Sequence, residues 1–61
     1  MKQHFIIDGD VFTAKIWKDK GTFMAECPEL NTTAMGKTIK SARFNLKETS
    51  RMILDKTQNN K

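Results

Sequence analysis

Residues 11–27 read VFTAKIWKDKGTFMAEC. Apolar and polar side chains alternate along residues 11–18 and again along residues 22–27, which is the period of β-strands with one better-buried face. The intervening DKG ends in Gly21, a residue that readily takes the positive φ of a hairpin loop. The stretch therefore predicts a β-hairpin, around which the rest of the fold can be built.

The register of this hairpin follows from aligning the apolar positions of its two strands. A shift of one residue would send every side chain to the opposite face, so the apolar pattern constrains the pairing. We expect Trp17 to lie opposite Thr22. The apolar face then pairs Ile16 with Phe23, Ala14 with Ala25 and Phe12 with Cys27.

The segment before the hairpin predicts one more strand. Residues 4–7 read HFII, which is aromatic and β-branched, and the DGD of residues 8–10 then supplies a turn signal. The sheet should therefore contain at least three antiparallel strands.

Pro28 marks the end of the second hairpin strand. Proline has no amide hydrogen to donate to a sheet, so regular pairing should end at Cys27 and residues 29–31 should form a loop. Residues 32–35 read TTAM and can form a brief further strand, which Gly36 ends.

The remainder of the chain predicts one long helix. Residues 39–56 contain no proline or glycine, and Thr38 before them is a favoured N-cap residue. On a helical wheel, one stripe has the spacing of a buried face. The residues expected in that stripe are Ile39, Ala42, Leu46, Thr49 and Ile53.

These elements predict an α+β domain in which three antiparallel strands, with a short extra strand as an option, pack on one long C-terminal helix. The domain should cover residues 1–56, and residues 57–61, TQNNK, are expected to form a frayed polar tail. A chain of 61 residues holds one domain at most.

A core this small usually needs reinforcement by disulfides, a metal or a second copy of the chain. The single cysteine, Cys27, cannot form an internal disulfide, and His4 with Cys27 falls short of the four ligands of a structural zinc. We therefore expect a homo-oligomer, either a dimer or a tetramer, without a cofactor.

Charge and hydropathy limit the environments in which the chain can function. The longest apolar runs, residues 5–7 and 52–54, are far below the ~20 residues needed to cross a bilayer, and no signal peptide is visible. We expect a soluble, cytoplasmic protein. Eleven Lys and Arg against seven Asp and Glu give a net charge of +4, which permits binding of nucleic acid or acidic protein but also serves solubility.

The residues after the hairpin turn carry a recognisable motif. Residues 23–30 read FMAECPEL, and residues 33–38 read TAMGKT before the amphipathic helix. This order resembles the HicB family, in which a strand ends in aromatic-x-Ala-Glu-Cys-Pro-Glu-Leu and is followed by a short strand, a Gly-polar-Thr step and a helix. The resemblance covers residues 11–56.

The resemblance implies a partial RNase H-like fold that lacks the nuclease active site and is usually oligomeric. In complete family members this domain shields a HicA-type RNA-cleaving toxin, and a separate C-terminal domain binds operator DNA. The present chain ends soon after the helix and is basic where family members are commonly acidic. The resemblance therefore predicts a non-catalytic, antitoxin-type domain that binds and occludes a HicA-like toxin, without operator binding.

Catalysis is the competing possibility, because an RNase H site needs carboxylates that converge on Mg²⁺. Asp8 and Asp10 flank a turn glycine, where aspartate is ordinary, and Glu48 lies away from the core stripe. His4 lacks a catalytic partner at a suggestive spacing, and Cys27 is in phase with buried apolar residues. We therefore expect no catalytic, cofactor-binding or metal-binding residue among the candidates Asp8, Asp10, Glu26, Glu48, His4 and Cys27.

Two surfaces are candidate interfaces. The helix side opposite the core stripe is basic around an aromatic residue, and it suits a phosphate backbone with base stacking, a protein partner or plain solvent exposure. Its residues are Lys37, Lys40, Phe44, Lys47 and Arg51. The second apolar face of the hairpin suits either self-association or an isolated exposed aromatic. Its residues are Val11, Trp17 and Met24.

Overall fold

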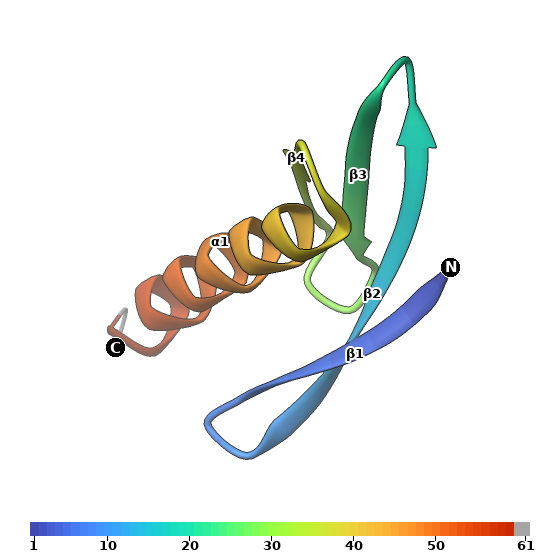
Figure 1. Cartoon of the computed structure of the whole chain (residues 1–61). Helices are drawn as coiled ribbons and strands as arrows, with labels where there is room; N and C mark the ends of the chain where they lie inside the picture. The colour runs from blue at the N-terminus through green and yellow to red at the C-terminus, as the bar shows by residue number, and fades with distance from the viewer. Residues whose placement is uncertain (60–61) are drawn as a thin grey trace.

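The computed structural model describes residues 1–59 as a four-stranded antiparallel sheet with one helix across one of its faces (Figure 1). Consecutive strands are neighbours, in the order β1-β2-β3-β4, so the sheet is a meander. The α+β prediction is confirmed, and the brief extra strand is present. The bounds are β1 Lys2–Ile7, β2 Asp10–Asp19, β3 Thr22–Cys27, β4 Thr32–Gly36 and α1 Ile39–Asn59.

Two-residue turns join the first three strands. Asp8 and Gly9 have φ angles of 52° and 84°, and Lys20 and Gly21 have φ angles of 51° and 80°. Positive φ at both central residues is the type I′ arrangement, whose twist matches the right-handed twist of the strands it joins. The glycines take these angles without strain, and Asp8 and Lys20 adopt them because the flanking pairing requires a tight reversal.

The predicted register between β2 and β3 is wrong. Asp19, rather than Trp17, lies opposite Thr22, and Trp17 lies opposite Met24. Pairing Trp17 with Thr22 leaves residues 18–21 between the paired positions, whereas the strands continue up to a two-residue turn. The shift is even, so every side chain keeps the face that the sequence predicted.

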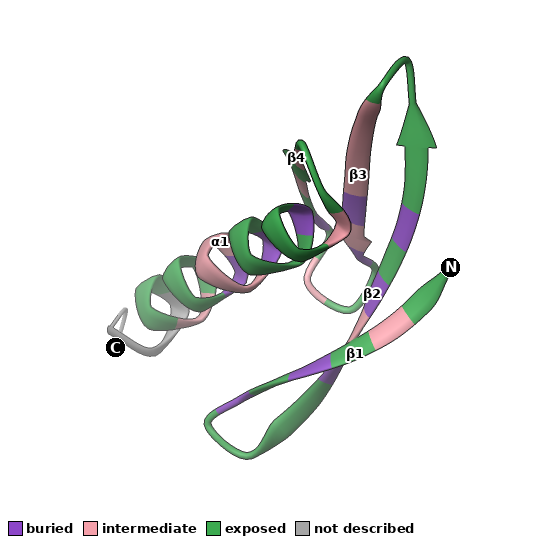
Figure 2. Cartoon of the chain, viewed as in Figure 1, coloured by how far each residue is buried: buried purple, intermediate pink, exposed green. Residues whose placement is uncertain are grey.

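The hydrophobic core lies between α1 and the predicted apolar face of the sheet (Figure 2). Phe5 and Phe12 stack with their ring centroids 5.7 Å apart, which joins β1 to the hairpin. Phe23 is only partly buried at the margin of this core. The buried members are Phe5, Ile7, Phe12, Ala14, Ile16, Ala25, Cys27, Ala42 and Leu46.

The core-facing stripe of α1 differs from the prediction at its C-terminal end. Ala42 and Leu46 are buried as predicted, but Ile53 is 41% exposed while Ser50 is fully buried. Leu54 packs against the core instead of Ile53. The buried stripe therefore runs through Ala42, Leu46, Ser50 and Leu54 at a spacing of four residues. Because an α-helix has 3.6 residues per turn, this stripe turns gradually around the helix axis.

A buried hydroxyl pair is the physical reason for this difference. Thr32 of β4 is 6% exposed, and its Oγ1 lies 3.2 Å from Ser50 Oγ. Each hydroxyl can donate to the other, so neither is left without a partner away from water. A prediction from apolar periodicity counts serine as a surface residue. The buried position was therefore predicted at Ile53 and not at Ser50.

The β4–α1 connection is held by a cap and a close approach. Thr38 is the N-cap as predicted, because the Ser41 amide donates to Thr38 Oγ1 at 3.0 Å. Gly36 ends β4 so close to the helix that a Cβ atom there would lie 2.5 Å from Ala42 N and 2.8 Å from Ser41 C. Glycine is thus the residue that lets β4 pack against the first turn of α1.

The helix continues to Asn59, beyond the predicted end at Lys56. Residues 60 and 61 of the predicted tail lie outside the described residues. Within residues 1–59, no helix has the length and apolar character required to span a membrane.

Candidate functional site

The carboxylates weighed for catalysis are spread over the molecule. Asp8 lies in the β1–β2 turn, Asp10 begins β2, and Glu26 lies in β3. Glu48 lies in α1, where its Oε2 is 3.8 Å from Nη1 of Arg51. Within residues 1–59, no group of three or more His, Cys, Asp or Glu side chains is placed to hold a metal ion. The four carboxylates do not converge on one site.

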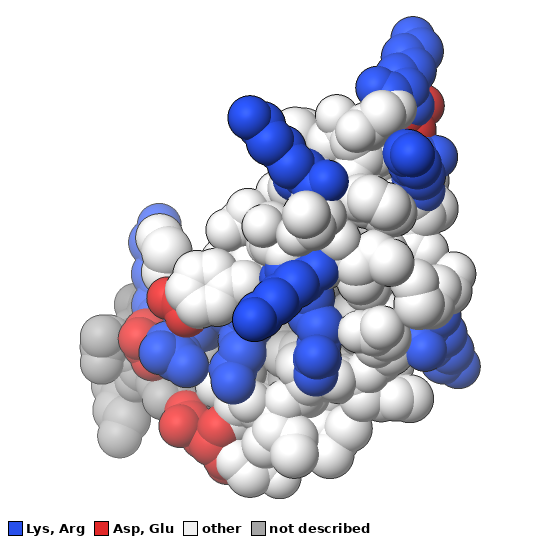
Figure 3. All heavy atoms as spheres, viewed as in Figure 1, with Lys and Arg blue, Asp and Glu red and all other residues white. Residues whose placement is uncertain are grey.

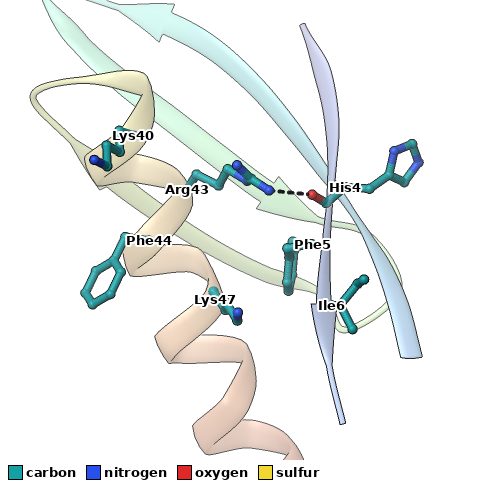
Figure 4. A pocket seen from close by; sticks show the side chains of 7 residues that line it. All are labelled: His4, Phe5, Ile6, Lys40, Arg43, Phe44 and Lys47. Carbon is teal, nitrogen blue, oxygen red and sulfur yellow. Dashed lines mark hydrogen bonds between the residues drawn. The ribbon is translucent and has the colours of Figure 1, made fainter. Parts of the chain in front are cut away.

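An open groove of about 470 Å³ runs between α1 and β1. Figure 4 shows the Arg43 side chain crossing from α1 to β1, whereas the Phe44 ring projects from α1 away from β1. The imidazole of His4 also points away from α1 in this view. The lining residues are Lys40, Arg43, Phe44 and Lys47 from α1, and His4, Phe5 and Ile6 from β1.

The groove is basic, because three cations and no carboxylate line it. Lys40, Arg43 and Lys47 recur at intervals of three and four residues, so they follow one side of α1. Phe44, which follows Arg43 on α1, is 61% exposed. Figure 3 shows Lys and Arg side chains gathered over α1 on the face in view. Their charge makes the groove attractive to an anionic partner.

The groove contains part of the interface predicted from the sequence. Lys37 lies before α1 and does not line the groove. Arg51 lies further along α1, beside Glu48, and also falls outside it. The predicted residues that the groove brings together are Lys40, Phe44 and Lys47.

Arg43 is the groove residue that sequence reasoning missed. On the helical wheel Arg43 lies beside the core-facing stripe, outside the basic side of the helix. Its three-residue spacing from Lys40 could have indicated that the two side chains are neighbours. Its Nη2 donates to the backbone oxygen of His4 at 2.9 Å, which caps an outward carbonyl of the edge strand β1. Asn45 does the same at the other edge, where its Nδ2 donates to the backbone oxygen of Met35 at 2.8 Å. The helix thus occupies one outward carbonyl at each edge of the sheet.

No family model, curated protein or solved structure matches the chain. The resemblance to the HicB family therefore remains a prediction from its sequence motif. The groove has to be interpreted from its own geometry and charge.

A separate polar cluster ties the β3–β4 loop to β2. The Glu29 carboxylate accepts hydrogen bonds from the Thr13 amide at 3.1 Å and from Thr13 Oγ1 at 2.7 Å. The Thr13 hydroxyl is the main reason that the pKa of Glu29 falls from 4.5 to about 2, because it stabilises the charged carboxylate. The cluster occupies the β2 edge beyond the point where β3 pairing ends.

Cys27 lies beside this cluster, with its Sγ 3.5 Å from Glu29 Oε1. Its side chain is fully buried. Burial raises the pKa of the Cys27 thiol, which favours the protonated form. The residue therefore belongs to the core, as its phase in the strand predicted.

The sheet face away from α1 carries the residues predicted for self-association. Trp17 lies opposite Met24, and Met24 lies opposite Met35, so these three form an apolar row across β2, β3 and β4. Trp17 and Met35 are 44% and 58% exposed. Val11 lies on the same face but pairs with Ile6 in a separate row. The Trp17–Met24–Met35 row is a second candidate surface, distinct from the groove.

Proposed function

We propose that this protein is a non-catalytic binding domain of the HicB-like antitoxin type, which occludes the surface of a partner protein. The proposed partner is a HicA-like RNA-cleaving toxin, and the proposed compartment is the cytoplasm. Support comes from the motif of residues 23–38 and from the groove between α1 and β1.

The observation that carries the proposal is the exposure of Phe44. Phe44 is 61% exposed, and Lys40 and Lys47 lie four positions before it and three positions after it on α1. A large aromatic side chain flanked by long cations is the composition of an interface hot spot, in which the ring supplies contact area and the charges orient the partner. Helix α1, which presents this group, packs on the sheet through Ala42 and Leu46.

The test is co-expression with a HicA-like toxin encoded beside this protein, followed by co-purification and a measurement of RNA cleavage. We expect a stable complex in which cleavage is suppressed. The variant Phe44→Ala should weaken the complex by about 30-fold, equivalent to about 2 kcal/mol for a hot-spot residue.

Met52→Ala is the matched control, because Met52 is also a large apolar residue of α1 and is 69% exposed outside the groove. This control should leave the affinity unchanged. Equal losses for the two variants, or no complex with the wild-type chain, would remove the proposed role of the groove.

Nucleic acid is the second candidate partner, because Lys40, Arg43 and Lys47 follow one side of α1 and Phe44 offers a ring for stacking. Such binding should weaken steeply as salt increases, because phosphate contacts release counterions. The double variant Lys40→Glu and Lys47→Glu should abolish it in a filter-binding or fluorescence assay with a single-stranded oligonucleotide.

A further inference from the structure

One edge of the sheet opens directly into the groove. Ile16 exchanges backbone hydrogen bonds with Met1, at 2.7 and 2.8 Å, which establishes the alternation of bonded and non-bonded pairs along β1 and β2. In an antiparallel pair this alternation directs the amide and carbonyl groups of every second residue away from the partner strand. In β1 these residues are Lys2, His4 and Ile6.

The Arg43 contact shows the direction in which this edge faces. The outward carbonyl of His4 accepts a hydrogen bond from the Arg43 guanidinium across the groove, so the β1 edge faces the side of α1 that carries Arg43 (Figure 4). The amide and carbonyl of Ile6, which also lines the groove, follow on the same edge. The groove therefore offers main-chain donors and acceptors along one wall and cations along the other.

We infer that the groove binds an extended, acidic segment of a partner protein, which adds to the edge of β1 as a fifth strand. The main chain of the segment bonds the outward groups of His4 and Ile6. Its acidic side chains, on the face turned towards α1, contact Lys40, Arg43 and Lys47. This inference rests on the proposed function and defines the chemistry of the segment that the protein binds.

The spacing of the cations along α1 suits such a segment. Lys40 and Lys47 are about 10 Å apart along the helix axis, at about 1.5 Å per residue. Side chains on one face of a strand repeat at about 6.8 Å, so two or three acidic residues at alternate positions cover the row of cations. Arg43 binds a carboxylate more strongly than it binds the neutral carbonyl of His4, because both partners of an Arg–carboxylate contact are charged. An acidic segment can therefore draw Arg43 away from the His4 carbonyl, which is then free to pair with the segment.

The same features disfavour the other occupants. A phosphodiester backbone offers no strong donor for the outward carbonyls of β1, whereas a peptide alternates donors and acceptors. A second copy of β1 contains Lys2 and no acidic residue, so pairing two β1 edges would bring like charges together. Charge and hydrogen-bonding pattern together favour an acidic peptide.

The probe is a synthetic peptide of about ten residues with alternating Glu and Thr, the length of a long strand. We expect binding by fluorescence anisotropy, together with slowed amide hydrogen exchange at His4 and Ile6. A peptide of alternating Lys and Thr should not bind. A Glu-Thr peptide N-methylated at the residues that pair with β1 should lose binding although its charge is unchanged, because it cannot donate to the strand edge.

Variants of the protein test the other wall. The double variant Lys40→Glu and Lys47→Glu should bind the Glu-Thr peptide about tenfold less tightly or worse. Lys20→Glu is the matched control, because Lys20 lies in the β2–β3 turn outside the groove. Its affinity should equal that of the wild-type chain.

Equal affinity for the N-methylated peptide would overturn strand addition, and tighter binding of a single-stranded oligonucleotide of equal charge would favour nucleic acid instead. The outcomes also separate the inference from the proposed function. Toxin binding that the Glu-Thr peptide does not compete with would overturn this inference alone. Peptide binding without toxin binding would overturn the toxin as partner and leave the groove with an acidic protein segment as its ligand.

Discussion

Glu29 joins two segments that are distant in the sequence through hydrogen bonds to one residue. Its carboxylate accepts from both the amide and the hydroxyl of Thr13, and its pKa falls to about 2 from an ordinary value of 4.5. The unfolded chain therefore binds more protons than the folded chain between these two pH values. The stabilisation is complete above about pH 4.5 and is lost as the pH falls towards 2.

The change Glu29→Gln should remove this acid-dependent part of the stability. We expect the urea midpoint of the wild-type chain to fall between pH 4.5 and about 2, and the midpoint of the variant to fall less steeply over that interval. Thr13→Val, which deletes the main hydrogen-bond donor, should return the pKa of folded Glu29 towards 4.5, so the fall should be smaller and should end at a higher pH. Identical pH profiles for Glu29→Gln and the wild-type chain would contradict the assignment.

The Thr32–Ser50 pair predicts a non-additive response to mutation. Ser50→Ala leaves the buried Thr32 hydroxyl without its partner, which should cost about 1–3 kcal/mol. Adding Thr32→Val removes the unsatisfied group, so the double variant should be more stable than Ser50→Ala alone. Urea denaturation of the four proteins in the cycle measures the coupling, and strict additivity would show that the two hydroxyls act independently.

At the scale of the elements, the contact between β4 and α1 depends on a missing side chain. A Cβ atom at Gly36 would meet the backbone of Ser41 and Ala42, and backbone atoms of a helix cannot give way as a flexible side chain can. Gly36→Ala should therefore destabilise the domain by about 1–3 kcal/mol through overpacking. Gly9→Ala is the comparison, because a Cβ at Gly9 meets no atom within 4 Å and the cost there comes only from its φ of +84°.

Thermal denaturation of the two variants distinguishes steric from conformational cost. For Gly36→Ala we expect a lower melting temperature together with a weaker connection between β4 and α1, seen as faster amide exchange in β4. Unchanged exchange in β4 would mean that the helix start shifts without loss of packing.

Helix α1 also does more than cover the core. Arg43 and Asn45 lie on either side of the core-facing stripe, so one helix can reach the outward carbonyls of both edge strands. One outward carbonyl at each edge is thereby satisfied by a side chain of α1, and the other outward groups of β1 stay available. The same geometry creates the groove, because the edge that Arg43 caps faces the cations of α1.

At the scale of the whole molecule, self-association remains a proposal that the outer sheet face can support. The Trp17–Met24–Met35 row is continuous across three strands, whereas Val11 lies in a separate row. We expect analytical ultracentrifugation to show a dimer or tetramer. Trp17→Lys should raise the dissociation constant about tenfold or more, as for an aromatic residue at an interface centre.

Met52→Lys is the control for this experiment, because it introduces the same charge at an exposed apolar position on α1. This variant should keep the assembly of the wild-type chain. A wild-type chain that stays monomeric at all concentrations would contradict the proposal.

The local pattern of the sequence was sufficient for the order of the elements, for the faces of the hairpin strands and for the N-terminal part of the buried helix stripe. The period of two in residues 11–18 and 22–27 identified the hairpin and its buried side, and Thr38 identified the helix start. Each of these features depends on residues close together in the chain, where side-chain period and capping chemistry act directly. The basic character of the groove was also visible, through Lys40, Phe44 and Lys47.

Only the tertiary structure decided the features that depend on distant partners. The burial of Ser50 required the Thr32 hydroxyl on another element. The β2–β3 register is a separate case, because it depended on the positive φ that Lys20 adopts in the turn, which its residue type does not predict. Arg43 joined the groove because it meets the backbone of His4, 39 positions earlier in the chain. A polar residue becomes a core residue or a site residue through the group it meets on folding, and that group is not encoded in the local pattern around it.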